Sequence, residues 1–299
     1  MRAKNISRLL ATRLIATVPL AAFLCSPTPG SATPLLGPDL TSFAVLGAST
    51  VTNTGATTID GNVGVSPGTA ITGSSTITLT GTYQTGASSA AGVAQTELVT
   101  AINNLGSLGP GTTEQANLSG LSLLPGVYKV PAGTSNLTGT LTLNGNGNAN
   151  AGWVFLMAST LITSPGSVIN VINTGAGAGI YWDVGSSATL GTTTAFEGNI
   201  LSLASVTLNQ GATIGCGRAL AETGAVTMIN NTINSAGCLG TVGAGSKGYS
   251  GGLNVVGSAV SFLPASPVPE PGSIALLGIA LGMLTVTLRR RPTHVAPGA

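Results

Sequence analysis

The sequence predicts an all-β solenoid accompanied by one α-helix, and three observations support this prediction. Short apolar–Thr–apolar segments recur at nearly constant intervals in the second half of the chain. Glycine, with 44 residues, separates these segments as it would at turns. A single stretch, residues 87–105, is poor in glycine and has apolar residues at helical spacing. Repeats of about 20 residues, each too small to bury a core alone, are typical of stacked coils.

The repeat is clearest after residue 188. One series consists of Ala188-Thr189-Leu190, Val206-Thr207-Leu208 and Val226-Thr227-Met228. A second series, expected on another face that is not involved in function, consists of Thr194, Thr213 and Thr232. Segments 199–201 and 218–220 occupy equivalent places in successive units, and segments 49–52, 76–80 and 137–143 have the same composition. Because strand side chains alternate, we expect the aliphatic residues to point inward and the threonines outward.

The predicted helix covers residues 87–105. Its apolar positions are Ala91, Ala94, Leu98, Ala101 or Ile102, and Leu105, a spacing that places them on one face. Gly106 and the following Gly109-Pro110 should end it. We expect this helix to cover one face that the coils leave apolar.

Charge is scarce and unevenly placed. Of the 299 residues 43% are hydrophobic and only 6% are charged, against about a quarter in ordinary soluble domains. Residues 33–268 contain three basic and seven acidic residues. This stretch has no basic patch for neutralising phosphates, which argues against nucleic-acid binding.

The N-terminus predicts a secretory signal over residues 1–32. A basic stretch precedes an apolar run from Leu14 to Leu24, and Gly30-Ser31-Ala32 supplies the small residues of a cleavage site. Cys25 follows the bulky Leu24, so we expect it to be removed with the signal and not lipidated. The domain itself should span residues 33–262 and face the outside of the cell.

The C-terminal segment, residues 263–299, contains Pro269-Glu270-Pro271, an apolar run 274–288 and three arginines, 289–291. This tripartite pattern resembles the PEP-CTERM sorting signal, which implies processing by an exosortase-type enzyme. An ordinary tail anchor remains the alternative. Either reading limits membrane contact to this tail.

Cys216 and Cys238 are the two cysteines left after signal removal. In an oxidising compartment they can pair, closing a loop worth about 3 kcal/mol in the chain-entropy model. A metal site is the competing interpretation, and it lacks support because the body contains no histidine or third cysteine. We therefore expect no metal and no cofactor.

Several separated motifs resemble the microbial ice-binding protein family. They are 43–55 (FAVLGASTVTNTG), 61–68 (GNVGVSPG), 124–128 (LPGVY), 153–155 (WVF), 181–185 (YWDVG) and 217–221 (GRALA). The resemblance runs from about residue 36 to 239 and implies a discontinuous right-handed β-helix of triangular section with one long helix alongside. It also implies that the first coils in sequence are not simply continuous in space with the later ones.

Ice is the partner that the threonines themselves favour. Stacked coils repeat every 4.8 Å or so, and outward residues two apart on a strand lie about 7 Å apart, so a threonine face forms a flat grid near the repeats of ice. Threonine offers a hydroxyl and a methyl in a stiff rotamer. The ladder Thr189, Thr207 and Thr227 is the preferred site, with Thr52 and Thr78 as early partners. The family's motif Thr-(Ala/Gly)-x-(Thr/Asn) adds Thr54, Thr57, Thr69 and Thr72. It also occurs at 100–103, inside the predicted helix.

Two rival functions are weaker. A solenoid lyase or hydrolase needs grouped carboxylates, and only Asp183, Glu197, Arg218 and Glu222 fall in adjacent units, where Arg218 and Glu222 are better read as structural. A surface adhesin binding exopolysaccharide or other cells would need an aromatic groove. Trp153, Tyr181 and Trp182 lie in apolar strand contexts and are expected in the core or under the helix. Ice binding is therefore the leading hypothesis, with the adhesin as the alternative.

Overall fold

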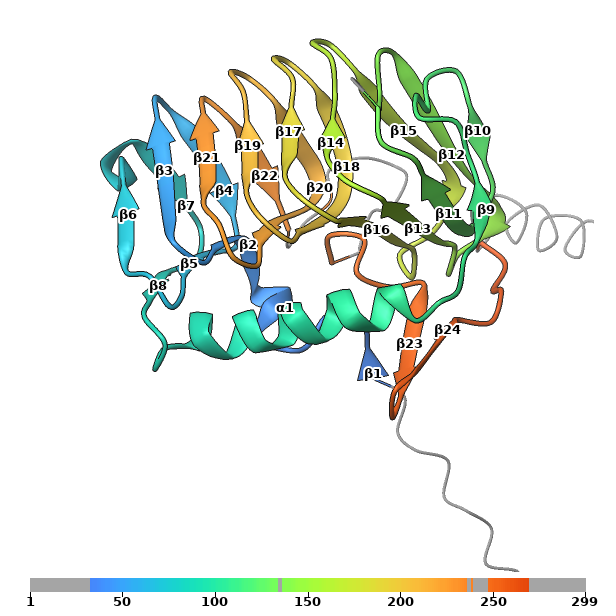
Figure 1. Cartoon of the computed structure of the whole chain (residues 1–299), viewed down its shortest axis with the longest axis horizontal. Coiled ribbons are helices and arrows are strands. Elements are labelled where there is room, and N and C mark those ends of the chain that lie inside the picture. The colour runs from blue at the N-terminus through green and yellow to red at the C-terminus, as the bar shows by residue number, and fades with distance from the viewer. Residues whose placement is uncertain (1–32, 134–135, 236–237, 239–246, 269–299) are drawn as a thin grey trace, which may run out of the picture. The chain divides into compact units, whose positions relative to one another are not determined.

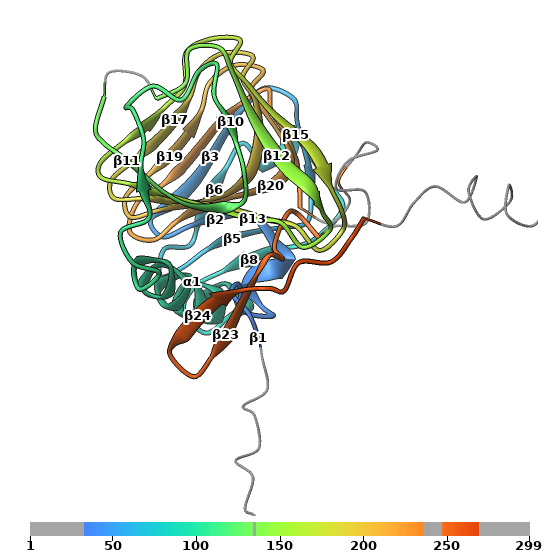
Figure 2. The ribbon, with the colours of Figure 1, turned by 90° about the vertical axis from the view of Figure 1, so that its right-hand side faces the viewer.

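The computed structural model describes residues 33–133, 136–235, 238 and 247–268. Most of their strands belong to parallel pairs in which successive turns of the chain stack in register. We call one such turn a coil. The strands of the coils form three faces, which we name the ladder face, the second face and the helix face (Figures 1 and 2).

The ladder face is one six-stranded sheet in which every pair is parallel. Its strands, in spatial order, are β14 (Leu161–Ile162), β17 (Ala188–Leu190), β19 (Val206–Leu208), β21 (Val226–Ile229), β3 (Thr50–Thr54) and β6 (Ala70–Thr72). The predicted series at Thr189, Thr207 and Thr227 is confirmed, because these residues pair directly across the sheet.

The second face follows the ladder face along each coil. Its strands, in spatial order, are β10 (Ser122–Leu123), β12 (Thr140–Asn148), β15 (Val168–Thr174), the first part of β18 (Ala195–Ser202), the first part of β20 (Thr213–Ala221), β22 (Thr232–Asn234), β4 (Thr57–Asp60) and β7 (Ile77–Leu79). Thr213 pairs with Thr232 as predicted. The prediction for Thr194 is wrong: Ala195 pairs with Thr213, while the buried Thr194 hydroxyl lies 2.8 Å from that of Thr163.

The helix face is completed by the later parts of β18 and β20. Its other strands are β9 (Thr112–Thr113), β11 (Gly126–Val130), β13 (Gly152–Met157), β16 (Gly179–Val184), β2 (Phe43–Gly47), β5 (Asn62–Val65) and β8 (Tyr83–Thr85). Residues 199–201 pair with residues 218–220, as the repeat predicts. Within β18 and β20, Gly198 and Gly217 have φ of 104° and 151° at the bend between the two faces. A Cβ on Gly217 would lie 1.9 Å from the carbonyl oxygen of Gly198, so this close approach requires glycine.

Helix α1 (Ala90–Gly106) runs along the helix face (Figure 1). It begins three residues later than predicted because the Ser89 side chain caps it, accepting a hydrogen bond from the Ala91 amide at 3.2 Å. The predicted apolar face is fully buried, namely Ala91, Ala94, Leu98, Ala101 and Leu105. It packs against strand residues that point out of the coils, including Leu46, Tyr181 and Leu220. Within the described ranges, no helix combines the length and apolar character needed to cross a bilayer.

The coils do not follow sequence order in space. The late strand β21 pairs with the early strand β3, and β22 likewise pairs with β4. The first two coils therefore continue the stack at the end of the late ones, and segments far apart in the sequence lie side by side (Figure 1). This is the discontinuity that the family resemblance implies.

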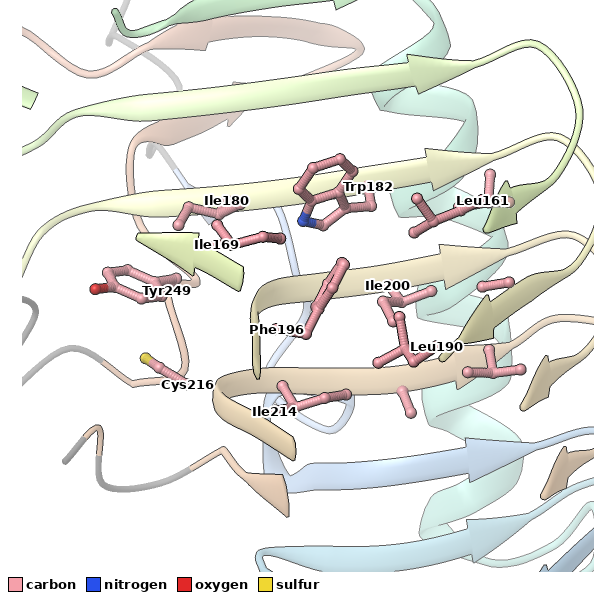
Figure 3. Close-up of a cluster of buried hydrophobic side chains, with 14 of the residues drawn as sticks. Leu161, Ile169, Ile180, Trp182, Leu190, Phe196, Ile200, Ile214, Cys216 and Tyr249 are labelled. Atoms are coloured by element: carbon pink, nitrogen blue, oxygen red, sulfur yellow. The ribbon is translucent and has the colours of Figure 1, made fainter. Parts of the chain in front are cut away.

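The core lies inside the coils and is aliphatic with an aromatic row. Phe155 and Trp182 stack with ring centroids 3.9 Å apart, and Tyr128 and Phe196 continue the row on either side. Figure 3 shows Trp182, Phe196 and Ile214 on successive strands. Trp153 and Trp182 are core residues and Tyr181 lies under the helix, so the prediction for these aromatic residues is confirmed.

A small antiparallel sheet lies beside the helix. It consists of β1 (Thr33–Pro34), β23 (Leu253–Val256) and β24 (Ala259–Phe262), so the two ends of the described chain pair with each other. Two short 3-10 helices, η1 (Leu40–Ser42) and η2 (Ser74–Thr76), complete the described elements. The predicted signal at 1–32 and the motif Pro269-Glu270-Pro271 lie outside the described residues.

Candidate functional site

Five threonines form one continuous ladder on the ladder face. Thr189, Thr207, Thr227, Thr52 and Thr72 are paired in register, each with the next. All five are half-buried or exposed, and neighbouring strands lie about 4.8 Å apart. At the early end the Thr72 hydroxyl donates to Thr52 Oγ1 at 3.2 Å. The ladder crosses the junction between late and early coils without interruption.

The remaining predicted threonines divide into two groups. Thr54 lies on the ladder face two residues beyond Thr52, and Thr69 is exposed just before β6. The structure corrects the predicted places of Thr57 and Thr78. Thr57 is only 1% exposed and hydrogen-bonds to Asn53 inside the coil, so it cannot contact an external surface. Thr78 belongs to the second face, where it pairs with Thr58.

The strands of the ladder face carry no charge. None of the six ladder-face strands contains Asp, Glu, Lys or Arg. The ladder ends at β14, where Ile162 pairs with Thr189. Uncharged strands without side-chain insertions make a regular face, with a hydroxyl and a methyl group repeated once per coil.

The corner between the ladder face and the second face is joined by a chain of buried and part-buried hydrogen bonds. Asn231 Nδ2 donates to the carbonyl oxygens of Asn209 and Ala212, both at 2.9 Å, and the Asn231 amide donates to Thr57 Oγ1 at 3.1 Å. Thr57 Oγ1 donates to Asn53 Oδ1 at 2.6 Å. Asn53 Nδ2 continues the chain to Thr76 Oγ1 at 2.9 Å.

This polar chain was not predicted from the sequence. Asn53 stands at a position where the equivalent residue of the neighbouring coil, Met228, is apolar. That replacement of an apolar residue by asparagine is the one signal that could have revealed it. Satisfied buried polar groups specify local geometry, because any displacement leaves a donor or acceptor unpaired.

Of the acidic residues that fall in adjacent coils, Asp183 and Glu222 lie close enough for their charges to interact. Asp183 lies on β16, and its pKa is raised to about 6 by desolvation and by the charge of Glu222. Glu197 lies where β18 bends between faces, and burial raises its pKa to about 8. Its Oε2 has no hydrogen-bond partner within the described chain. Over the same described ranges, no group of three His, Cys, Asp or Glu side chains is placed to hold a metal ion.

Arg218 is a structural residue, as predicted. Its guanidinium is 1% exposed and donates to Asn199 Oδ1 at 2.8 Å and to the Thr41 carbonyl at 2.7 Å. Further acceptors are the carbonyl oxygens of Ser235, Lys247 and Gly248. One side chain thus joins the N-terminal segment, β18 and the segment after Lys247.

A large cavity beside the helix is also structural in character. It has a volume of about 800 Å³ and lies among residues 33–38, α1 and the β23–β24 turn. The carboxylate of Glu97, which lines it, accepts a hydrogen bond from the Leu40 amide at 2.7 Å. Desolvation raises the pKa of Glu97.

The predicted disulfide is confirmed. Cys216, on β20, is bonded to Cys238, with the two Cα atoms 4.8 Å apart. The bond anchors the chain that leaves β22 back onto the preceding coil.

Comparison with known proteins identifies the fold and the tail. A family model described as ice-binding-like matches residues 45–234, and one described as a PEP-CTERM protein-sorting motif matches residues 267–291. A protein named "Ice-binding protein" from Nostoc sp. (strain HG1) is 43% identical over 252 residues, 84% of this chain and 85% of that protein.

Two solved structures show the same fold. An ice-binding protein from an Antarctic biological consortium is 41% identical with a TM-score of 0.62, covering 67% of this chain and 90% of its own. The ice-binding protein of the Antarctic ascomycete Antarctomyces psychrotrophicus is 36% identical, also with a TM-score of 0.62, covering 68% and 98%. The chain belongs to the ice-binding-like family and carries a PEP-CTERM sorting motif.

Proposed function

We propose that this protein adsorbs to ice through the ladder face and thereby inhibits ice growth or recrystallisation. The observation that carries the proposal is the ladder of five threonines in register across five coils. The names of its relatives, "Ice-binding protein" in Nostoc and in the solved structures, support the same conclusion.

The physical basis is the regularity of the face. A single hydroxyl or methyl contact with ice competes with liquid water and contributes little, so binding needs many contacts made together on a preordered surface. Threonine has a β-branched side chain with restricted rotamers. The absence of charge on these strands means that no tightly hydrated group holds water in another geometry.

We infer that the coils form a right-handed β-helix of triangular section with α1 alongside. Three sheet faces per coil and parallel pairing between coils support this geometry. Parallel crossovers are right-handed in about 98% of cases. Each face is then flat along the stacking direction, as a surface complementary to a crystal must be.

We infer an external location. The PEP-CTERM motif at 267–291 supports export and processing by an exosortase-type enzyme, with residues 1–32 as signal, 33–262 as the working domain and 263–299 as the sorting tail. The role is non-catalytic. The surface adhesin has less support, because Trp153, Tyr181 and Trp182 are buried and line no groove.

The test is to observe ice growth under a microscope with the purified chain. We expect the unmodified chain to shape crystals and inhibit recrystallisation, and Thr207→Tyr, in the middle of the ladder, to weaken both. Thr113→Tyr, on the exposed strand β9 of the helix face, is the matched control and should behave as the unmodified chain. If the unmodified chain leaves ice unchanged, ice binding is wrong and a surface adhesin takes its place.

A further inference from the structure

A second ladder of threonines lies on the second face. Thr213, Thr232, Thr58 and Thr78 are paired in register, each with the next. Thr58 and Thr78 are exposed, and Thr213 and Thr232 are half-buried. Ala195 and then Val168, both exposed, extend the same column beyond Thr213 with apolar side chains.

The two ladders are built by the same coils. Four neighbouring coils each place one threonine on each face, and the two threonines of a coil are separated by five or six positions. These pairs are Thr207 and Thr213, Thr227 and Thr232, Thr52 and Thr58, and Thr72 and Thr78. The ladders therefore run side by side along the stack, on either side of one corner.

That corner has a fixed geometry. The hydrogen bonds from Asn231 through Thr57 and Asn53, which are buried, and on to the exposed Thr76 connect these coils at the turn between the two faces. Rotating one face relative to the other would break the hydrogen bonds of the buried Thr57 hydroxyl, which is closed off from water. The two ladders thus keep a constant orientation relative to each other.

The second face carries little charge. Its described strands contain two acids, Asp60 and Glu197. The Asp60 carboxylate accepts a hydrogen bond from Thr80 Oγ1 at 2.6 Å. Burial raises the pKa of Glu197 to about 8, so this side chain is mostly neutral near pH 7. Neither acid stands in the threonine column.

We propose that the ice-binding site continues around the corner, so that the second face adsorbs to a different set of ice planes from those bound by the ladder face. The inference rests on the proposed function and extends it, because one flat crystal plane cannot contact two faces that meet at an angle. Two ladders from the same coils give the protein two adsorbing surfaces.

The experiment is to grow a single ice crystal in the fluorescently labelled chain and to record which planes become decorated. We expect the unmodified chain to decorate two sets of planes. Thr207→Tyr should lose one set, Thr213→Tyr the other, and the double variant both. Thr58→Tyr, at an exposed position of the second ladder, should reproduce the pattern of Thr213→Tyr. Unchanged thermal unfolding midpoints, followed by circular dichroism, show that each variant is folded.

The outcomes separate the two claims. If the unmodified chain decorates one set and Thr213→Tyr and Thr58→Tyr leave it unchanged, the second face is not an ice-binding surface, while the proposed function stands. If Thr207→Tyr alone removes all decoration, the inference is also overturned. If the unmodified chain decorates no plane, both the proposed function and this inference fail together.

Discussion

The backbone amide of Asn231 donates a hydrogen bond to Oγ1 of Thr57 at 3.1 Å, although the two residues are 174 positions apart in the chain. The same Thr57 hydroxyl donates to Asn53 Oδ1. This bond joins the last late coil to the first early coil, at the point where the threonine ladder crosses from one to the other. The continuity of the ladder therefore depends on a buried side chain that contacts no external surface.

Replacing Thr57 with valine should destabilise the fold. The change keeps the shape but leaves the Asn231 amide and Asn53 Oδ1 without their partner, at a cost of about 1–3 kcal/mol in the free energy of unfolding. Denaturant unfolding measures the difference. Thr58→Val, at the next residue and exposed, is the control and should change stability by less than about 0.5 kcal/mol. Equal effects at the two positions would show that the Thr57 bond is not important for the junction.

Arg218→Met should destabilise the protein by at least about 2 kcal/mol, because several buried carbonyl oxygens and Asn199 Oδ1 would lose a charged donor. Arg218→Lys should rescue only part of this, since an ammonium group cannot reproduce the planar fork. Thermal and denaturant unfolding give the values. The control is Lys247→Met, because Lys247 contributes its carbonyl oxygen and its side chain is exposed. A fully stable Arg218→Met variant would contradict the structural role of this residue.

Removing the disulfide should also lower stability. Cys216 and Cys238 are separated by 22 residues, and a crosslink of this length stabilises by about 3 kcal/mol. The variant with both cysteines replaced by alanine should unfold at a correspondingly lower denaturant concentration. A reductant should lower the midpoint of the unmodified chain and leave that of the variant unchanged. A reductant effect of the same size in both would mean that the disulfide is not its cause.

Stability should fall as pH rises through the weakly acidic and neutral range. Burial raises the pKa of Glu197 in the folded state to about 8, above its ordinary value of 4.5. The folded state then binds more protons than the unfolded state, so the contribution of Glu197 is complete below about pH 4.5 and is lost as pH approaches 8. Unfolding midpoints between pH 5 and pH 8.5 should show this decline. Glu197→Gln, which is neutral throughout, should reduce the decline and leave the part below about pH 6 that Asp183 contributes. An identical decline in the variant would exclude Glu197 as a source.

Much of the fold follows from spacing. Parallel stacking places equivalent residues of successive coils in register, so the regular recurrence of apolar–Thr–apolar segments predicted the pairing of Thr189, Thr207 and Thr227. The helix was predictable because its buried residues are three or four positions apart in a glycine-poor stretch. Both patterns are local, and neither depends on which coil lies next to which.

The wrong predictions concern residues near the turns between the faces of a coil. A threonine motif does not reveal whether a side chain near a turn points inward or outward, and so Thr57 and Thr194 were placed on the surface although both are buried. Thr78 was assigned to the wrong face. In the early coils the repeat of about 20 residues would have predicted the pairs that the structure contains, Thr52 with Thr72 and Thr58 with Thr78. The junction of β21 with β3 follows no repeat, and only the family resemblance implied it.

The junction also sets the order in which the chain can fold. The two N-terminal coils are synthesised first, yet the strands they need, β21 and β22, end at Asn234. Two coils alone cannot bury a continuous core, since stacked repeats need at least about three for stability. Contacts between such distant segments form slowly. The two N-terminal coils must therefore wait for their partner strands through most of the synthesis of the domain, and the threonine ladder can be completed only when nearly the whole domain is available.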